Sequence, residues 1–258
     1  MNPWLARSCG FALLVLGACG GGDETVVAIE PLPVGGGTFF TDGNIGFSDV
    51  GANFYRVNAV SGETAVQPLP GESESAESRC PALFALDLRP DGKVLAVGRR
   101  SADLFEADVR ATRCRRLGAL AEVMAALAVR ADGHLFTVSV TNRLYQFDAL
   151  AQPLGATPLV CAPNAAPCRV DGIDFGPDST LYAVGALGLW SRITVATGQL
   201  TTLRTGVGFG DDFDIDAQGR VRGLKSGELR TFDLAGNPTR HAINVFGGTA
   251  FATGVVHR

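Results

Sequence analysis

The sequence predicts an all-β protein built from repeated four-stranded sheets, and three observations support this prediction. A strand–turn–strand segment recurs along the chain, most clearly at residues 85–97 (ALDLRPDGKVLAV) and 172–184 (GIDFGPDSTLYAV). The turns of its successive copies fall at Asp91, Asp132, Asp178 and Gln218, which lie 41, 46 and 40 residues apart. The chain also contains 33 glycines, enough for many tight turns, and no segment has a long helical period.

The two halves of each copy are predicted to form a hairpin. Alternating apolar residues lie on both sides of Asp-Gly or a related dipeptide, and Gly and Asp tolerate the positive φ that hairpin turns require. Two copies are more degenerate, at residues 127–136 and 213–221. Residues 117–129 come closest to a helical pattern, and their alanines predict one helical turn or a helical loop between sheets.

A third strand follows each hairpin, and a more polar fourth stretch such as 199–203 follows the third strand. The third-strand copies lie at residues 54–58, 104–108, 144–148, 189–193 and 229–233. Four short antiparallel strands repeated every 40 to 45 residues are typical of a β-propeller blade. We therefore predict a propeller of five four-stranded blades.

The two ends of the chain are predicted to complete one blade together. The first blade lacks an inner strand, whereas residues 248–254 have the pattern of an inner strand with no strands after it. Pairing the two would leave the ring without a free edge. The alternative is a six-bladed ring that uses residues 37–50 in a degenerate blade of its own.

The repeated motif over residues 83–233 resembles a bacterial family of repeat propellers of unknown function. It is similar, more distantly, to the NHL and gluconolactonase-type propellers. These motifs specify blades and no chemistry, because propellers carry many unrelated functions.

The amino end is typical of an exported lipoprotein. Arg7 is followed by an apolar run at 11–16 that is too short to span a bilayer, and then by small residues. Leu16, Gly17, Ala18 and Cys19 resemble the lipobox of bacterial lipoproteins, which implies a signal peptide at 1–18 and a lipid on Cys19. The alternative is a buried apolar segment with an ordinary core thiol.

Residues 19–36 are predicted to be a flexible, glycine-rich tether, and residues 37–258 the propeller domain. In lipoproteins, aspartate directly after the cysteine favours the inner membrane, and this chain has Gly20 there. The resemblance therefore implies the bacterial envelope, with the domain held at the outer membrane and facing the periplasm or the cell surface.

Composition argues against nucleic acid as a partner. The formal net charge is −4, only Lys93 and Lys225 are lysines, and we find no basic stripe along the chain. About 220 residues after the tether are enough to bury the core of one domain, which we expect to be monomeric.

Four cysteines remain once Cys9 is removed with the signal and Cys19 is lipidated. Four cysteines allow three connectivities. We favour Cys80 with Cys114 and Cys161 with Cys168, because each pair flanks or falls within one repeat. Metal ligation is the alternative, but neither pair has the CxxC spacing of zinc sites.

An acidic stretch at residues 210–216 raises the question of a calcium site. Asp212, Asp214 and Asp216 alternate and so share one face of a strand, with Asp212 and Asp214 as the first candidate ligands. The residues at the sixth and twelfth positions of an EF-hand loop, Ala217 and Gly223, do not fit that motif. The alternative is structural: Asp214 repeats the role of Asp87 and Asp174 and accepts hydrogen bonds from turns or neighbouring blades.

The sequence carries no recognisable catalytic motif. None of His134, His241 and His257 has a plausible serine partner, and no Gly-x-Ser-x-Gly occurs. The channel ligands of the gluconolactonase-type enzymes have no matching set here. We therefore predict a scaffold that binds a protein or glycan partner in the envelope, without a cofactor. The alternative is a metal-dependent enzyme with its site in the propeller channel.

Overall fold

The structure is a computed structural model that describes residues 44–48, 54–58, 64–66, 81, 83–91, 93–98, 100–108, 113–161, 169–207, 212–225, 228–239, 243–244 and 254–256. All of these belong to one compact unit, Leu32–Arg258. The predicted signal peptide, Cys19 and the tether lie outside the described residues, as do Cys80 and Cys168.

The strands form five antiparallel sheets of four strands each. Four sheets use consecutive strands, in the order inner to outer: β4 (Leu83–Leu88), β5 (Val94–Gly98), β6 (Asp103–Asp108) and β7 (Arg113–Ala119); β8 (Met124–Val129), β9 (Leu135–Ser139), β10 (Arg143–Phe147) and β11 (Pro153–Pro158); β12 (Val170–Phe175), β13 (Leu181–Gly185), β14 (Leu189–Thr194) and β15 (Gln199–Arg204); β16 (Asp212–Ile215), β17 (Val221–Lys225), β18 (Glu228–Phe232) and β19 (Ile243–Asn244).

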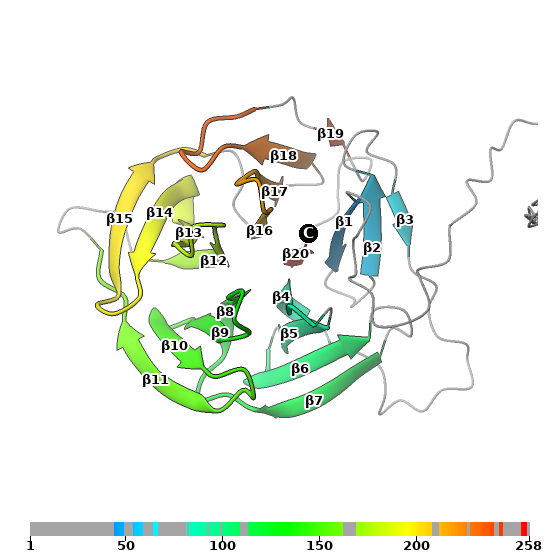
Figure 1. Cartoon of the computed structure of the whole chain (residues 1–258), viewed down its shortest axis with the longest axis vertical. Coiled ribbons are helices and arrows are strands. Elements are labelled where there is room, and N and C mark those ends of the chain that lie inside the picture. The colour runs from blue at the N-terminus through cyan, green and yellow to red at the C-terminus, as the bar shows by residue number, and fades with distance from the viewer. Residues whose placement is uncertain are drawn as a thin grey trace, which may run out of the picture. The chain divides into compact units, whose positions relative to one another are not determined.

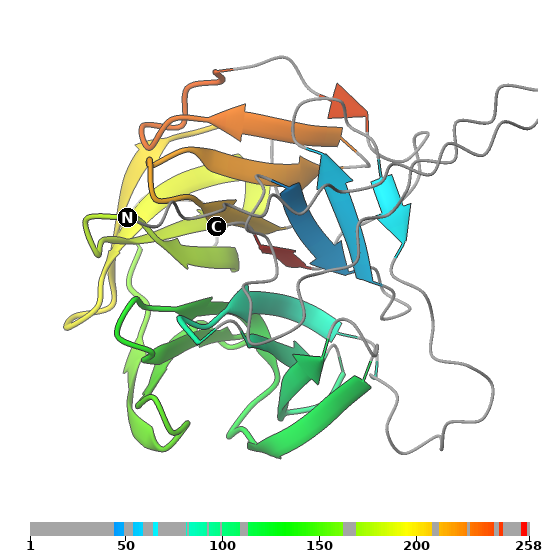
Figure 2. The same cartoon turned by 45° about the vertical axis from the view of Figure 1, so that its right-hand side comes forward.

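The remaining sheet joins the two ends of the chain. Its order is β20 (Gly254–Val256), β1 (Asn44–Ser48), β2 (Phe54–Asn58) and β3 (Thr64–Val66). The inner strands β4, β8, β12, β16 and β20 contact one another in turn, and β20 contacts both β16 and β4 (Figure 1). In Figure 2 the orange strands of the β16–β19 blade lie as successive rows of one sheet.

The predicted all-β propeller fold with four-stranded antiparallel blades is confirmed. Residues 44–48 pair with β2 and β20, so they share a sheet with the strands that follow instead of starting a sheet of their own. The helical turn predicted within residues 117–129 is wrong. Residues up to Ala119 complete β7, and Met124 begins the fully buried strand β8, because burial between blades outweighs the helix preference of alanine.

The core lies between neighbouring blades. Phe136 of β9 meets Phe175 of β12 edge to face, with ring centroids 4.9 Å apart. Trp190 of β14 stacks on Tyr182 and meets Phe213 of β16 edge to face at 4.9 Å. Each blade is thus held to the next by rings that its strands project sideways, and none of the described helical residues forms a helix long enough to cross a membrane.

Candidate functional site

Each inner strand has one edge that no other strand of its own sheet covers, and two aspartates occupy the backbone donors of this edge. Asp87 Oδ1 accepts from Leu88 N at 2.5 Å, and Oδ2 accepts from Val129 N in the next blade, also at 2.5 Å. Asp174 repeats this arrangement with Phe175 N at 2.7 Å and Ile215 N of the next blade at 2.6 Å. These carboxyl groups therefore satisfy buried N–H groups and join adjacent blades.

This finding bears out the structural interpretation of the inner-strand aspartates for Asp87 and Asp174. Ala128 stands at the matching position of β8, so that blade contributes no carboxyl group. Asp214 stands at the matching position of β16 and is also buried. The repeat thus places acids at the same depth of the channel in three of the blades.

The three carboxyl groups converge. Asp87, Asp174 and Asp214 each offer an oxygen atom, and these atoms all lie within 4.8 Å of one another. Burial raises the pKa of Asp174 well above its ordinary value, and the charges of Asp214 and Asp87 raise it further. Three buried carboxylates this close favour either a retained proton or a bound cation.

The acidic stretch chosen from the sequence is divided by the structure. Asp214 faces the three-carboxyl cluster, whereas the side chain of Asp212 lies outside the described part of the chain. Asp216 accepts from Gln218 N and Arg220 N, and its Oδ2 lies 2.5 Å from Arg220 Nε. The oxygen ligands best placed for a metal ion are therefore those of Asp87, Asp174 and Asp214.

A cavity of about 430 Å³ lies over this cluster, at the end of the channel where the inner hairpins turn. Three consecutive blades line it, with Asp174 and Asp214 beside the arginines Arg130, Arg220 and Arg222. Arg222 stands opposite Asp214 in the β16–β17 pairing, and its side chain is only 10% exposed. The cavity therefore offers both guanidinium donors and carboxyl groups to a ligand.

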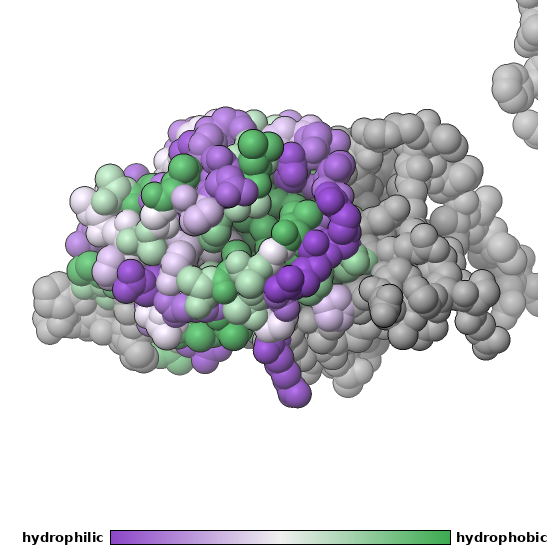
Figure 3. Space-filling model, turned by 90° about the horizontal axis from the view of Figure 1, so that it is seen from below, coloured by the Kyte–Doolittle hydropathy of each residue, from purple (hydrophilic) through white to green (hydrophobic). Residues whose placement is uncertain are grey.

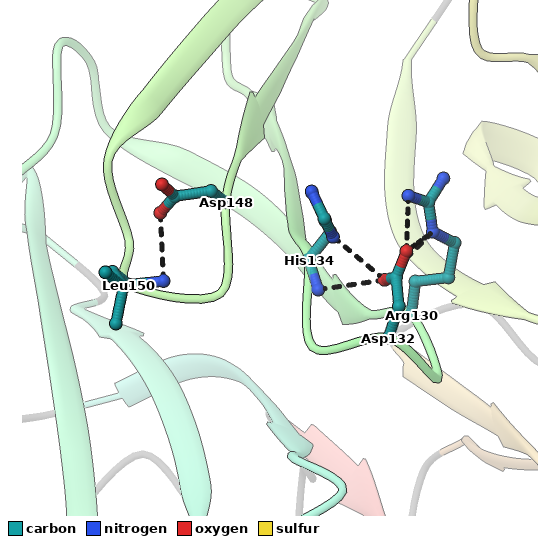
Figure 4. Close-up of polar contacts among 5 residues, drawn as sticks. All are labelled: Arg130, Asp132, His134, Asp148 and Leu150. Atoms are coloured by element: carbon teal, nitrogen blue, oxygen red, sulfur yellow. Dashed lines mark hydrogen bonds and ion pairs between the residues drawn. The ribbon is translucent and has the colours of Figure 1, made fainter.

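The hairpin turns around the cavity are fixed by aspartates, as Figure 4 shows for the β8–β9 turn. Asp132 Oδ1 accepts from His134 N at 3.1 Å and lies 3.0 Å from His134 Nδ1. Arg130 donates to the same carboxylate, which lowers the pKa of Asp132. Asp148 similarly accepts from Leu150 N in the β10–β11 turn. His134 thus belongs to a turn, and His241 and His257 lie outside the described residues.

The cysteine predictions are reached only in part. Cys114 of β7 is half-buried against the core of the β4–β7 blade, and Cys161 packs beside the core between the β8–β11 and β12–β15 blades. Their predicted partners, Cys80 and Cys168, lie outside the described residues, so both pairings stay predictions.

Sequence reasoning placed Asp87, Asp174 and Asp214 at equivalent positions but missed that they meet. It also missed the arginines of the cavity. The signal for the meeting was present, because inner strands of a closed ring bring equivalent positions to one axis. Nothing in the sequence marked Arg222, which reaches the site only through the β16–β17 pairing.

No protein-family model matches this chain, and no curated protein matches it. Among solved structures, the chain is similar to virginiamycin B lyase from Staphylococcus aureus, with 12% identity, a TM-score of 0.46, and coverage of 79% of this chain and 71% of that one. It is also similar to a protein of unknown function from Bacteroides caccae, with 13% identity, a TM-score of 0.47, and coverage of 78% and 72%. At these identities the likeness is one of fold and not of activity.

Proposed function

We propose that this protein is a lipid-anchored envelope propeller that binds a protein or glycan partner at the mouth of its channel. The observation that carries the proposal is the cavity of about 430 Å³ over the carboxyl cluster. Turns of three consecutive blades line it, so a rigid sheet scaffold holds its walls. Concave sites of a few hundred cubic ångströms with a few convergent polar groups are the usual form of a ligand site.

The chemistry of the walls supports a polar partner. Arginine donates to the carbonyl and hydroxyl oxygens of peptides and sugars, whereas carboxylates accept from amide N–H and hydroxyl groups. Arg130 and Arg220 lie on the exposed side of the cavity, and Asp174 and Asp214 on its buried side. A partner that offers both donors and acceptors would therefore be matched at both depths.

The partner site can be tested with a photo-crosslinking residue in full-length protein produced in its own envelope. Ser179 is exposed and lines the cavity, whereas Thr201 is exposed on β15, away from it. We expect a discrete crosslinked product from position 179 and none from position 201. Equal labelling from both positions would count against a partner at the channel mouth.

The anchor is supported by the sequence of residues 16–19 and by the glycine-rich segment that follows it. Two or more acyl chains on one cysteine give stable membrane attachment without any protein contact. We expect Cys19→Ala to remain unprocessed and to lose its lipid, so that metabolic labelling with a radioactive fatty acid marks only the parent protein. Fatty-acid labelling of the variant, or unchanged mobility of a processed form, would refute the anchor.

The proposal includes two structural features. The sheet β20-β1-β2-β3 serves as the fifth blade and closes the ring, and the disulfides Cys80–Cys114 and Cys161–Cys168 staple loops of the exported domain. A disulfide of this kind contributes roughly 2–4 kcal/mol by restricting the unfolded chain.

A metal-dependent site in the channel is the second candidate function, and the approach of three carboxyl groups to within 4.8 Å favours it. Oxygen ligands suit calcium. If the site binds calcium, the native protein retains about one ion per chain after dialysis, and Asp174→Asn with Asp214→Asn loses it. Elemental analysis of both proteins measures this, with Asp178→Asn as the control, and an ion-free native protein refilled by no added calcium would exclude the candidate.

A further inference from the structure

An open cleft lies between the β4–β7 and β8–β11 blades, far along the chain from the channel-mouth residues. Its volume is about 710 Å³. Its apolar lining comes from both blades: Leu104, Leu117, Leu120, Tyr145, Phe147 and Leu150. Leu150 is 81% exposed. Figure 3 views the domain from the side on which β7 and β11 lie in Figure 1, and hydrophobic residues gather there between hydrophilic ones.

The same place between the β12–β15 and β16–β19 blades is filled by an indole ring. The repeat aligns Val97 with Val184, and these residues pair with Leu104 and Trp190 respectively. Trp190 is fully buried, stacks on Tyr182 at 5.3 Å and donates from Nε1 to Leu234 O at 2.9 Å. Leu104 therefore stands where the other blade has tryptophan, and it leaves the space unfilled.

The side chain that covers the indole is also missing at the cleft. Trp190 pairs with Arg204, whose Nη1 donates across the blade interface to Asn237. Leu104 pairs instead with Gly118, and a Cβ atom added there would meet nothing within 4 Å. The cleft thus lacks both the ring and its cover.

The opposite wall keeps its shape. The turn after β18 has a hydrogen bond from Gly236 N to Asp233 O, and the turn after β10 has the same bond from Ala151 N to Asp148 O, both at 2.9 Å. The residue equivalent to Leu234 is Ala149, which lines the cleft. A wall that elsewhere receives an indole is therefore present here with a smaller side chain.

Charge near the cleft favours an acidic partner. Residues 89–116 contain eight arginines and lysines against four aspartates and glutamates, a net charge of +4 in a chain whose total is −4. Arg115 lines the cleft and its side chain is 67% exposed, although it also pairs with Glu106 at 3.0 Å. This local excess is typical of surfaces that attract acidic segments.

We propose that the cleft between the β4–β7 and β8–β11 blades is a docking site for an aromatic side chain, flanked by acidic residues, that a partner protein inserts. A large ring buried in a preformed pocket is the usual anchor of such interfaces. The inference rests on the proposed binding function but concerns a different surface, so the crosslinking at Ser179 and the experiment below can fail independently.

The test uses the full-length protein and synthetic peptides as probes. The first peptide is acetyl-Asp-Glu-Trp-Glu-Asp-amide with 5-fluorotryptophan, and its binding is followed by fluorine NMR. The other two carry alanine in place of tryptophan, or lysine in place of the acids, and compete with the first. We expect the first peptide to bind at least tenfold more tightly than either competitor.

The decisive variant is Leu104→Trp with Gly118→Arg, which rebuilds at the cleft the filling and the cover seen around Trp190. We expect it to fold with an unchanged or higher melting temperature and to weaken peptide binding at least tenfold. Thr201→Arg adds the same charge on exposed β15 and should bind like the parent. If the double variant does not fold, Gly118→Arg alone extends into open space and should also block binding. Undiminished binding to the filled cleft, or equal binding of the alanine peptide, overturns the proposal.

Discussion

Replacing Trp190 with alanine is expected to lower the free energy of unfolding by about 3–5 kcal/mol, the usual cost of removing a large buried ring. The indole is fully buried between two blades, stacked on Tyr182 and in edge contact with Phe213. Its removal opens a cavity at the interface and takes away the donor for Leu234 O. Urea unfolding followed by circular dichroism measures the change.

Two further variants separate the contributions of Trp190. Trp190→Phe keeps a ring against Phe213 but loses the N–H donor, so it should cost less than the alanine variant. Leu203→Ala removes a partly exposed side chain from the neighbouring strand β15 and should change stability by no more than about 0.5 kcal/mol. An alanine variant as stable as Leu203→Ala would show that the ring does not hold the blades together.

Replacing Asp174 with alanine is the second large effect, with an expected loss of about 2 kcal/mol or more. The change leaves the buried N–H groups of Phe175 and Ile215 without their acceptor, and each unsatisfied group costs roughly 1–3 kcal/mol. Relief of the crowding with Asp87 and Asp214 offsets part of this loss. Asp178→Ala is the matched control, because Asp178 accepts from Thr180 N in an exposed turn four residues later.

The pH dependence of Asp174→Asn tests the raised pKa of Asp174. The folded-state pKa lies above the unfolded value, so the favourable contribution is complete below the unfolded pKa and is lost as the pH rises through the folded pKa. The asparagine variant has no such group. Its stability relative to the parent should therefore improve as the pH rises from 4 to 8, and a difference independent of pH would contradict the shift.

The blades were predictable because their signals are local. Asp-Gly turns between alternating apolar residues specify hairpins, and a repeat of 40 to 46 residues specifies how many strands each blade holds. The error at residues 117–129 has the same origin, since a local alanine preference says nothing about the neighbouring blade that buries Met124 and Leu127.

The candidate sites could be predicted only in part. The equivalence of Asp87, Asp174 and Asp214 is visible in the aligned repeats, but their approach to within 4.8 Å depends on the ring that brings the inner strands together. The cleft depends on a comparison of interfaces. Leu104 and Gly118 are unremarkable in sequence, and they matter only because Trp190 and Arg204 occupy their places between two other blades.

The sequence by itself determined the four-stranded blade, the turn positions and the expectation of a lipidated Cys19, because turn chemistry, apolar alternation and the lipobox pattern are each contained in a few adjacent residues. Only the tertiary structure decided which acids converge on the channel, which arginines line its mouth and which interface stays open. These features depend on side chains from different blades, 40 or more residues apart, whose distances are set by the packing of one blade against the next.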